Sequence, residues 1–233
     1  PESQQVPPGP ATDNGVLASV FMGLAISPDN KTVYVAGGQE NKIYMFDINS
    51  GKKTDSINCS YSDKKADYTH GYIGDMVLSA DGKRLYAVDQ IGFRMIAIDV
   101  QSKSIRYNVP VGRYPFGITL SPDEKTVYVA NVGMYQYNLV KRRKNGAWKN
   151  GSIDFPAAAY GSKQSEEGIH SDSLDIPGLG PINTDESFSV WAISLQKNSS
   201  PRVVAKIKTG NLVGQMVEDF PAVGGSSPNS IVA

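Results

Sequence analysis

Side chains suited to ligand binding occur in short segments that separate strand-like stretches of the sequence. They comprise an imidazole, a guanidinium, a carboxylate, two amides and three aromatic rings: His70, Tyr72, Asp89, Gln90, Arg113, Tyr114, Phe116 and Asn131. Such groups exchange hydrogen bonds with polar ligands and stack on planar ones. We interpret the set as a candidate binding site. The alternative for each is structural: Tyr114 and Phe116 as packing between sheets, Arg113 as the partner of a carboxylate, His70 as an exposed loop residue.

The sequence contains none of the motifs that mark common catalytic centres. Gly-x-Ser-x-Gly, the glycine-rich phosphate loop and His-Glu-x-x-His are all absent. Two histidines are too few for a His-rich zinc site. One acidic stretch offers oxygen ligands, but its spacing matches no metal loop, and we interpret it as solvated. It contains Glu166, Glu167, His170, Asp172, Asp175, Asp185 and Glu186. We predict no catalytic residue, no metal and no cofactor.

Composition narrows the classes of function. The chain has 233 residues and a formal net charge of zero, which argues against general nucleic-acid binding. We interpret its one basic run, Lys141–Lys144, as a solvated loop. No stretch of about 18 apolar residues occurs, so no transmembrane segment is predicted. The single cysteine, Cys59, has no internal disulfide partner, and we expect it to be buried at the end of a strand.

A repeated strand–turn–strand pattern must position the candidate site. Ile118–Asn131 reads as two strands around a Ser-Pro-Asp turn, in which proline pre-sets φ and aspartate bonds nearby backbone. Ile26–Ala36 is nearly the same peptide, and Leu78–Val88 is a looser copy. Their serines, Ser27, Ser79 and Ser121, are 52 and 42 residues apart. Such a period, filled with strands and turns, is typical of the blades of a β-propeller.

The rest of each repeat completes a four-stranded blade. Third strands follow at Lys42–Ile48 and Phe93–Val100, and fourth strands follow at Lys53–Asn58 and Ile105–Val109. We therefore predict an all-β chain of four-stranded antiparallel blades. The alternative, a β-sandwich, is disfavoured because the turns of a sandwich do not repeat in sequence.

The blades divide the chain into segments and leave the ring open. We expect an N-terminal arm at 1–15, blades at 16–58, 71–111 and 114–210, and the inner strand of a further blade from about 226, at Pro228–Val232. Closed propellers have roughly 4–8 blades, because closure protects the sheet edges. We therefore expect a fragment of a larger, about seven-bladed propeller, or a propeller completed by another chain. The alternative is a self-contained domain with further strands in an insertion.

The candidate binding residues fall on one face of this arrangement. Loops after the second and fourth strands share the face opposite the Ser-Pro-Asp turns, and they converge at the mouth of the central channel. Blade 3 is interrupted on the same face by an insertion at 132–187. A loop of this length is usually functional or disordered. We interpret it as a lid over the channel or a contact with another domain.

The repeats also resemble a known family. Ser121–Asn131, which reads Ser-Pro-Asp-Glu-Lys-Thr-Val-Tyr-Val-Ala-Asn, and third strands ending in Ile-Asp resemble the YVTN-repeat β-propellers, which are bacterial, extracytoplasmic and surface-layer-like. These are related in fold to lactonase-type, quinoprotein-type and WD40 propellers. The resemblance covers about 16–131 and 188–232. Phe188–Leu195, Pro201–Gly210 and Ser226–Asn229 are similar to the propeller half of fusions with an alkaline-phosphatase-superfamily domain, whose ligands and nucleophile map to no residue here.

Three functions follow as expectations. The first is a periplasmic, secreted or cell-surface scaffold that binds a small molecule, a protein partner or a second copy at the channel mouth. The second is enzymatic, as a lactonase-like hydrolase or as the non-catalytic half of a phosphatase or phosphodiesterase fusion. The third is a structural role in a surface layer. Repeats without a catalytic constellation favour the first.

Overall fold

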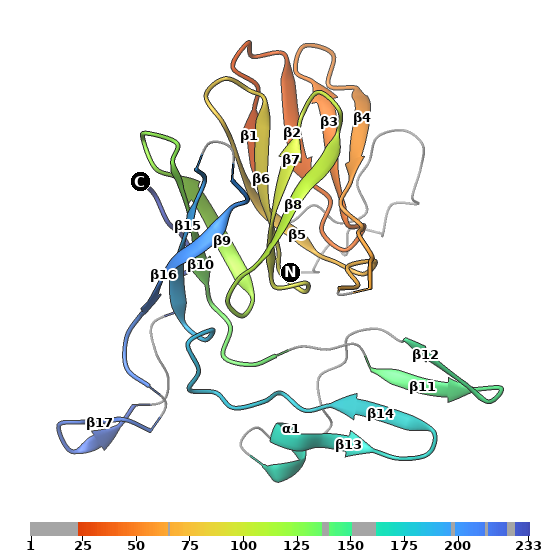
Figure 1. Ribbon diagram of the computed structural model, residues 1–233, viewed down its shortest axis with the longest axis vertical. Coiled ribbons are helices and arrows are strands. Elements are labelled where there is room, and N and C mark those ends of the chain that lie inside the picture. Colours follow the sequence, from red (N-terminus) through yellow and green to blue (C-terminus); the bar gives the residue numbers. More distant parts are fainter. Residues whose placement is uncertain are drawn as a thin grey trace, which may run out of the picture.

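The computed structural model of the chain describes residues 23–64, 66–136, 140–150, 162–196, 199–212, 214–222 and 227–233. Within these residues, three four-stranded antiparallel sheets follow one another in chain order, side by side (Figure 1). The protein is an all-β partial β-propeller, which confirms the predicted fold class. The predicted arm at 1–15 and the predicted blade start at 226 lie outside the described residues.

Each blade uses its strands in sequence order from the inside outwards. Blade 1 contains β1 (Leu24–Ile26), β2 (Thr32–Ala36), β3 (Lys42–Asp47) and β4 (Lys53–Asn58). Blade 2 contains β5 (Ile73–Leu78), β6 (Arg84–Asp89), β7 (Arg94–Asp99) and β8 (Ser104–Pro110). Blade 3 contains β9 (Pro115–Leu120), β10 (Thr126–Asn131), β15 (Ser189–Ser194) and β16 (Arg202–Lys208).

One turn joins the first two strands in every blade. In blade 3, Ser121 Oγ donates to Asp123 Oδ1 at 2.7 Å and accepts the Thr126 N–H at 3.0 Å. The same two bonds recur around Ser27 and Ser79. The serine and aspartate side chains thus satisfy backbone groups that the tight turn leaves unpaired, which explains why this tripeptide pattern repeats.

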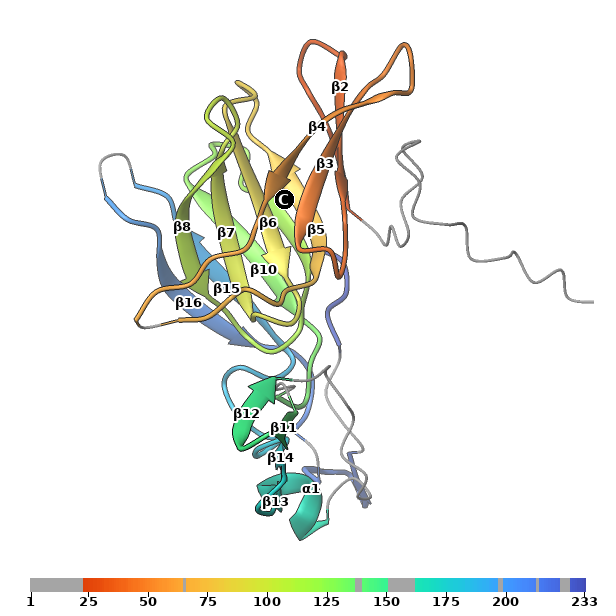
Figure 2. The same ribbon diagram turned by 90° about the vertical axis from the view of Figure 1, so that its right-hand side faces the viewer.

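Apolar side chains fill the spaces between neighbouring blades. The space between blades 1 and 2 buries Tyr34, Ala36, Ile43, Ile57, Cys59, Ile73, Met76, Leu85, Ala87, Ile96 and Ile98. The space between blades 2 and 3 buries Tyr86, Val88, Met95, Val109, Ile118, Leu120, Val127, Val129, Trp191 and Ile193. Strand residues alternate between the two faces of a sheet, so the middle blade, blade 2, contributes to both cores (Figure 2).

The insertion forms a separate sheet beyond the blades. It contains β11 (Lys141–Lys144), β12 (Ala147–Asn150), helix α1 (Lys163–Glu167), β13 (Gly168–His170) and β14 (Leu174–Pro177), with the sheet order β12-β11-β14-β13. Both views place this sheet below the blades (Figures 1 and 2). The basic run is a strand and not the predicted loop, because β11 pairs with both β12 and β14; all four side chains are exposed.

The inner strand of a further blade, expected at Pro228–Val232, stays a prediction. Residues 227–233 are irregular, since no described strand pairs with them. They nevertheless lie against blade 3, because a Cβ added at Gly117 on β9 would lie 3.2 Å from the Asn229 carbonyl oxygen. In the same way, a Cβ added at Gly23, just before β1, would lie 2.7 Å from the Cα of Asp75 on β5 of the next blade. A short hairpin, β17 (Met216–Val217) and β18 (Phe220–Pro221), precedes this segment. Within the described ranges, no helix is both long and apolar enough to cross a membrane.

Candidate channel-mouth site

The loops after the second and fourth strands lie at the end of the blades from which the insertion projects (Figure 1). The backbone joins them across blades, because Gly38 of blade 1 pairs with Ile73 of blade 2 through two hydrogen bonds. This end is the predicted channel-mouth face, and the eight candidate residues lie on its loops or at the adjoining strand ends. Four of the eight are buried and four are accessible.

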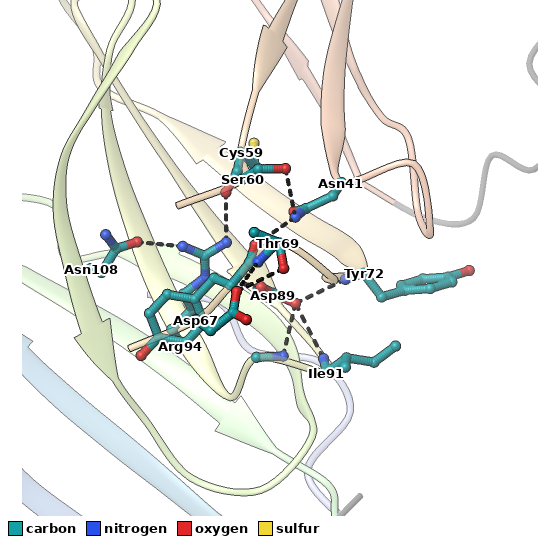
Figure 3. A network of polar contacts seen from close by, with 12 residues as sticks. Asn41, Cys59, Ser60, Asp67, Thr69, Tyr72, Asp89, Ile91, Arg94 and Asn108 are labelled. Atoms are coloured by element: carbon teal, nitrogen blue, oxygen red, sulfur yellow. Dashed lines mark hydrogen bonds and ion pairs between the residues drawn. The ribbon is translucent and has the colours of Figure 1, made fainter. Parts of the chain in front are cut away.

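Asp89 and Arg94 form an ion pair that is fully buried (Figure 3). Arg94 Nε donates to Asp89 Oδ2 at 2.9 Å. The other oxygen of Asp89 accepts the backbone N–H groups of Tyr72 and Gly92, both at 2.9 Å. One carboxylate therefore fixes both the fourth-to-first loop, through Tyr72, and the second-to-third loop of blade 2, through Gly92. Full pairing of this kind is what a charge needs to remain in a dry interior.

The remaining donors of Arg94 hold the segment that links blades 1 and 2. They reach Asn108 Oδ1 and the Cys59 carbonyl oxygen, both at 2.6 Å. The guanidinium lies 4.1 Å from the centre of the Tyr68 ring, in a cation–π contact. Asn41 Nδ2 donates to the Tyr68 carbonyl at 2.9 Å, which ties the same segment to blade 1. Arg94 thus acts as an internal clamp between two blades.

Arg113 plays a comparable part at blade 3, although it pairs with carbonyls and not with a carboxylate. It is 2% exposed, and its Nη1 donates to the Met134 carbonyl at 2.7 Å and to the Pro181 carbonyl at 2.5 Å. Met134 and Pro181 lie near the two ends of the insertion. Arg113 therefore holds both ends of the insertion at the blade surface.

Asn131 and Gln90 complete the buried group. Asn131 ends β10, and its Nδ2 donates to the Ser189 carbonyl at 3.2 Å, across the start of β15. Gln90 follows β6, and its side chain lies against Gly74, where a Cβ would clash with the amide. Asn131 Oδ1, Gln90 Nε2 and Arg113 Nε are buried with no partner among the described residues.

His70, Tyr72, Tyr114 and Phe116 are the accessible candidates. His70 is exposed, and the three aromatic residues are half-buried. The rings of Tyr114 and Phe116 stack with centroids 6.4 Å apart and planes 29° apart. Tyr114 has a left-handed backbone, with φ of 49°. Whether these residues bind a ligand stays a prediction.

Burial also shifts the pKa values of three groups in this region. It raises the pKa of the Cys59 thiol to about 12, which makes the thiol unreactive in the folded protein. Burial likewise lowers the pKa of Arg113 and raises that of Tyr114. Both shifts disfavour the charged form, and for Arg113 the hydrogen bonds to carbonyls keep the guanidinium in place.

Sequence reasoning missed Arg94, Tyr68, Asn41 and Asn108, which complete the buried network. A signal for Arg94 was present, because one charged residue begins an otherwise apolar strand, Arg94-Met95-Ile96-Ala97-Ile98. A buried strand tolerates such a charge only beside an opposite one, and Asp89 faces it directly across β6 and β7. No comparable signal marks Tyr68 or Asn41, whose roles depend on the path of a loop.

Comparison with known proteins does not assign the chain to a family. No protein-family model matches it, and no curated protein matches it. Among solved structures, hydrazine synthase from Kuenenia stuttgartiensis is similar at 19% identity with a TM-score of 0.43, covering 84% of this chain and 51% of that one. A functionally unknown protein from Desulfotomaculum acetoxidans is similar at 12% identity with a TM-score of 0.47, covering 83% and 44%.

A periplasmic gluconolactonase from Pseudomonas aeruginosa is also similar, at 15% identity with a TM-score of 0.37, covering 82% of this chain and 58% of that one. The chain thus spans about half the length of the structures it resembles. The propeller assignment rests on the sheets and inter-blade cores described above.

Proposed function

We propose that this chain is a sector of an extracytoplasmic β-propeller scaffold, that it acts by binding and not by catalysis, and that the outward face of blade 1 binds a blade of a second copy. Support for the scaffold part comes from the channel-mouth loops, whose buried polar groups hold backbone in place. The docking part rests on one observation, the exposure of apolar residues on blade 1 at positions that are core in blades 2 and 3.

The repeat register makes this comparison residue by residue. Leu24 and Ile26 on β1 oppose Val35 and Val33 of β2, just as Ile118 and Leu120 on β9 oppose Val129 and Val127 of β10. Leu24 and Ile26 are 61% and 57% exposed, whereas Ile118 and Leu120 are 6% and 9% exposed.

The second row of the face shows the same difference. Phe46 pairs with Val33 and is half-buried. Its counterparts in blades 2 and 3, Ile98 and Ile193, are fully buried. The outward face of blade 1, defined by Leu24, Ile26, Val33, Val35, Tyr44 and Phe46, is therefore an inter-blade face without a neighbouring blade among the described residues. Its exposed part is β1, because Val35 and Tyr44 are only 7% and 6% exposed.

The opposite face of blade 3 carries the matching half of such an interface. Tyr34 of blade 1 and Tyr86 of blade 2 are buried where each blade packs on the next. Tyr128 stands at the same position on blade 3 and is half-buried. A second copy can therefore place its blade 1 on this face once residues 229–231 move away from Gly117. Burial of exposed apolar area supplies the driving force.

Solution mass as a function of concentration tests the docking. We expect self-association that Leu24→Ser with Ile26→Ser weakens at least tenfold and that Trp148→Ser, at an exposed apolar residue on β12 of the insertion, leaves unchanged. A chain ending at residue 226 should associate more strongly, because the face of blade 3 is then clear. A strictly monomeric chain at all concentrations would contradict docking of a second copy. Turnover of a lactone by the purified chain would contradict the non-catalytic part alone.

A further inference from the structure

A cleft of about 540 Å³ lies between blades 2 and 3, away from the channel-mouth loops. Its size falls within the range of roughly 300–1,000 Å³ that holds small ligands. The lining comes from the first turn and the outer strands of blade 2, and from the turns of blade 3: Asp81, Lys83, Arg84, Tyr86, Ala97, Tyr107, Glu124, Leu195, Gln196, Ser199 and Pro201. Both blades are present in the chain, so the cleft does not depend on the open ring.

One row of the cleft lining on blade 2 has a small residue between two tyrosines. Tyr86, Ala97 and Tyr107 face one another across β6, β7 and β8 on the side of blade 2 that faces blade 3. In blade 1 the equivalent row is Tyr34, Met45 and Asp55, and Met45 packs into the inter-blade core. Ala97 has the smaller side chain but is only 2% exposed, and Tyr86 is 8% exposed, so the accessible residue of this row is Tyr107, at 37%.

The charges around the cleft are not equivalent. Glu124 accepts the Ala80 N–H at 2.5 Å, and Asp81 accepts the Ser79 hydroxyl at 2.7 Å and the Lys83 N–H at 2.9 Å. Both carboxylates are thus committed to the turn. Lys83 Nζ lies 3.7 Å from Asp81.

Arg84 is the remaining charged residue of the cleft lining. Among the described residues, its guanidinium donates no hydrogen bond and forms no ion pair, although its backbone N–H bonds Ser79 Oγ at 2.9 Å. A planar cation beside two aromatic rings suits a planar anion, because the guanidinium binds a carboxylate through two parallel hydrogen bonds and the rings stack on a flat apolar body.

We propose that this inter-blade cleft binds an aromatic carboxylate, with the ring system against the accessible Tyr107 ring and the carboxylate on Arg84. The site is separate from the outward face of blade 1, so it does not depend on the docking of a second copy. It gives the scaffold a small-molecule site on the side opposite the channel mouth.

Titration with 2-naphthoate, followed by calorimetry, tests the site. We expect saturable binding with one molecule per chain, and at least tenfold weaker binding of 2-naphthylmethanol, which has the same ring system and no charge. Ala97→Met should abolish the binding by filling the cleft, and blade 1 shows that the fold accepts methionine there. Arg84→Gln should weaken naphthoate binding about tenfold or more, because a charge-assisted pair is lost. Arg143→Gln, at an exposed arginine on β11 of the insertion that is not in the cleft lining, serves as the control.

Three results would overturn the proposal. Absence of saturable naphthoate binding by the folded wild-type chain would remove the site. Equal binding by the Ala97→Met variant, shown to be folded by its circular dichroism, would place the ligand elsewhere. Equal affinity for the acid and the neutral alcohol would reject the carboxylate class and the role of Arg84.

Discussion

Arg94 is the single residue whose replacement we expect to destabilise the fold most. Arg94→Met keeps much of the side-chain volume, yet it leaves the Asp89 carboxylate buried without its counter-charge and removes bonds to Asn108 and Cys59. Breaking a buried pair in this way costs about 3–5 kcal/mol. The free energy of unfolding, from denaturant titration, should fall by that amount.

A matched control is available on the same blade. Arg106 pairs with Asp99 at 3.4 Å, but its side chain is 52% exposed. An exposed pair contributes about 0–1 kcal/mol, so Arg106→Met should change the stability little. Similar losses for the two variants would mean that the Arg94 network is not an internal clamp.

Residue types in the sequence indicate which side chains have the chemistry of binding, but not which of them are accessible to a ligand. Asp89 and Arg113 have the chemistry of ligand contacts, and both instead hold loop backbone in the interior. Asp89 is the last residue of β6 and pairs with Arg94, the first residue of β7, so both charges of the buried pair lie beside the turn between these strands. Burial of Arg113 depends on the insertion folding back over it, and no local sequence pattern predicts the path of the insertion.

At the scale of elements, the turn between the third and fourth strands offers a test of backbone strain. Gly51 in blade 1 and Lys103 in blade 2 occupy the same turn position, with φ of 65° and 53°. A side chain in this left-handed region costs about 1 kcal/mol or somewhat more. Gly51→Ala should therefore destabilise the protein by about 1 kcal/mol, and Lys103→Gly should stabilise it by a similar amount, as measured by thermal and denaturant unfolding.

The ion pair between Lys103 and Asp55 must be separated from this backbone effect. Both side chains are 42% exposed, so the pair contributes little. Lys103→Gln removes the charge and keeps the strained backbone, and it should show no gain in stability. A gain for Lys103→Gln equal to that for Lys103→Gly would contradict the strain argument.

The elements that the sequence predicted well are those that repeat. The two Ser-Pro-Asp turns and the looser copy Ser79-Ala80-Asp81 reinforced the interpretation of one another, and all three form the same hydrogen bonds. The insertion has no second copy, and a basic run such as Lys141–Lys144 looks solvated whether or not its backbone pairs. Pro228–Val232, the expected inner strand of a further blade, lies against Gly117 of blade 3 as β5 lies against Gly23 of blade 1, but the strands it would pair with are not among the described residues.

At the scale of the whole molecule, the blades touch only their neighbours, so stability is distributed as in a linear array. Blade 1 packs through one face onto blade 2, while Leu24 and Ile26 on its outward face stay exposed. Blade 2 packs through both of its faces. The repeat predicted an open arrangement of this kind. The exposure of Leu24 and Ile26 then shows that the outward face of blade 1 is the inter-blade face left uncovered.

We therefore expect blade 1 to separate before the rest of the molecule unfolds. Cys59 is buried between blades 1 and 2, and Trp191 is buried between blades 2 and 3. In a Trp148→Phe variant, Trp191 is the remaining tryptophan of the two in the chain. Cys59 should react with a thiol reagent at a lower denaturant concentration than the one at which Trp191 fluorescence changes, because local opening requires less free energy than global unfolding. Coincident transitions would show that the three blades unfold as one cooperative unit. In a self-associated form with a covered blade 1, the two transitions should move together.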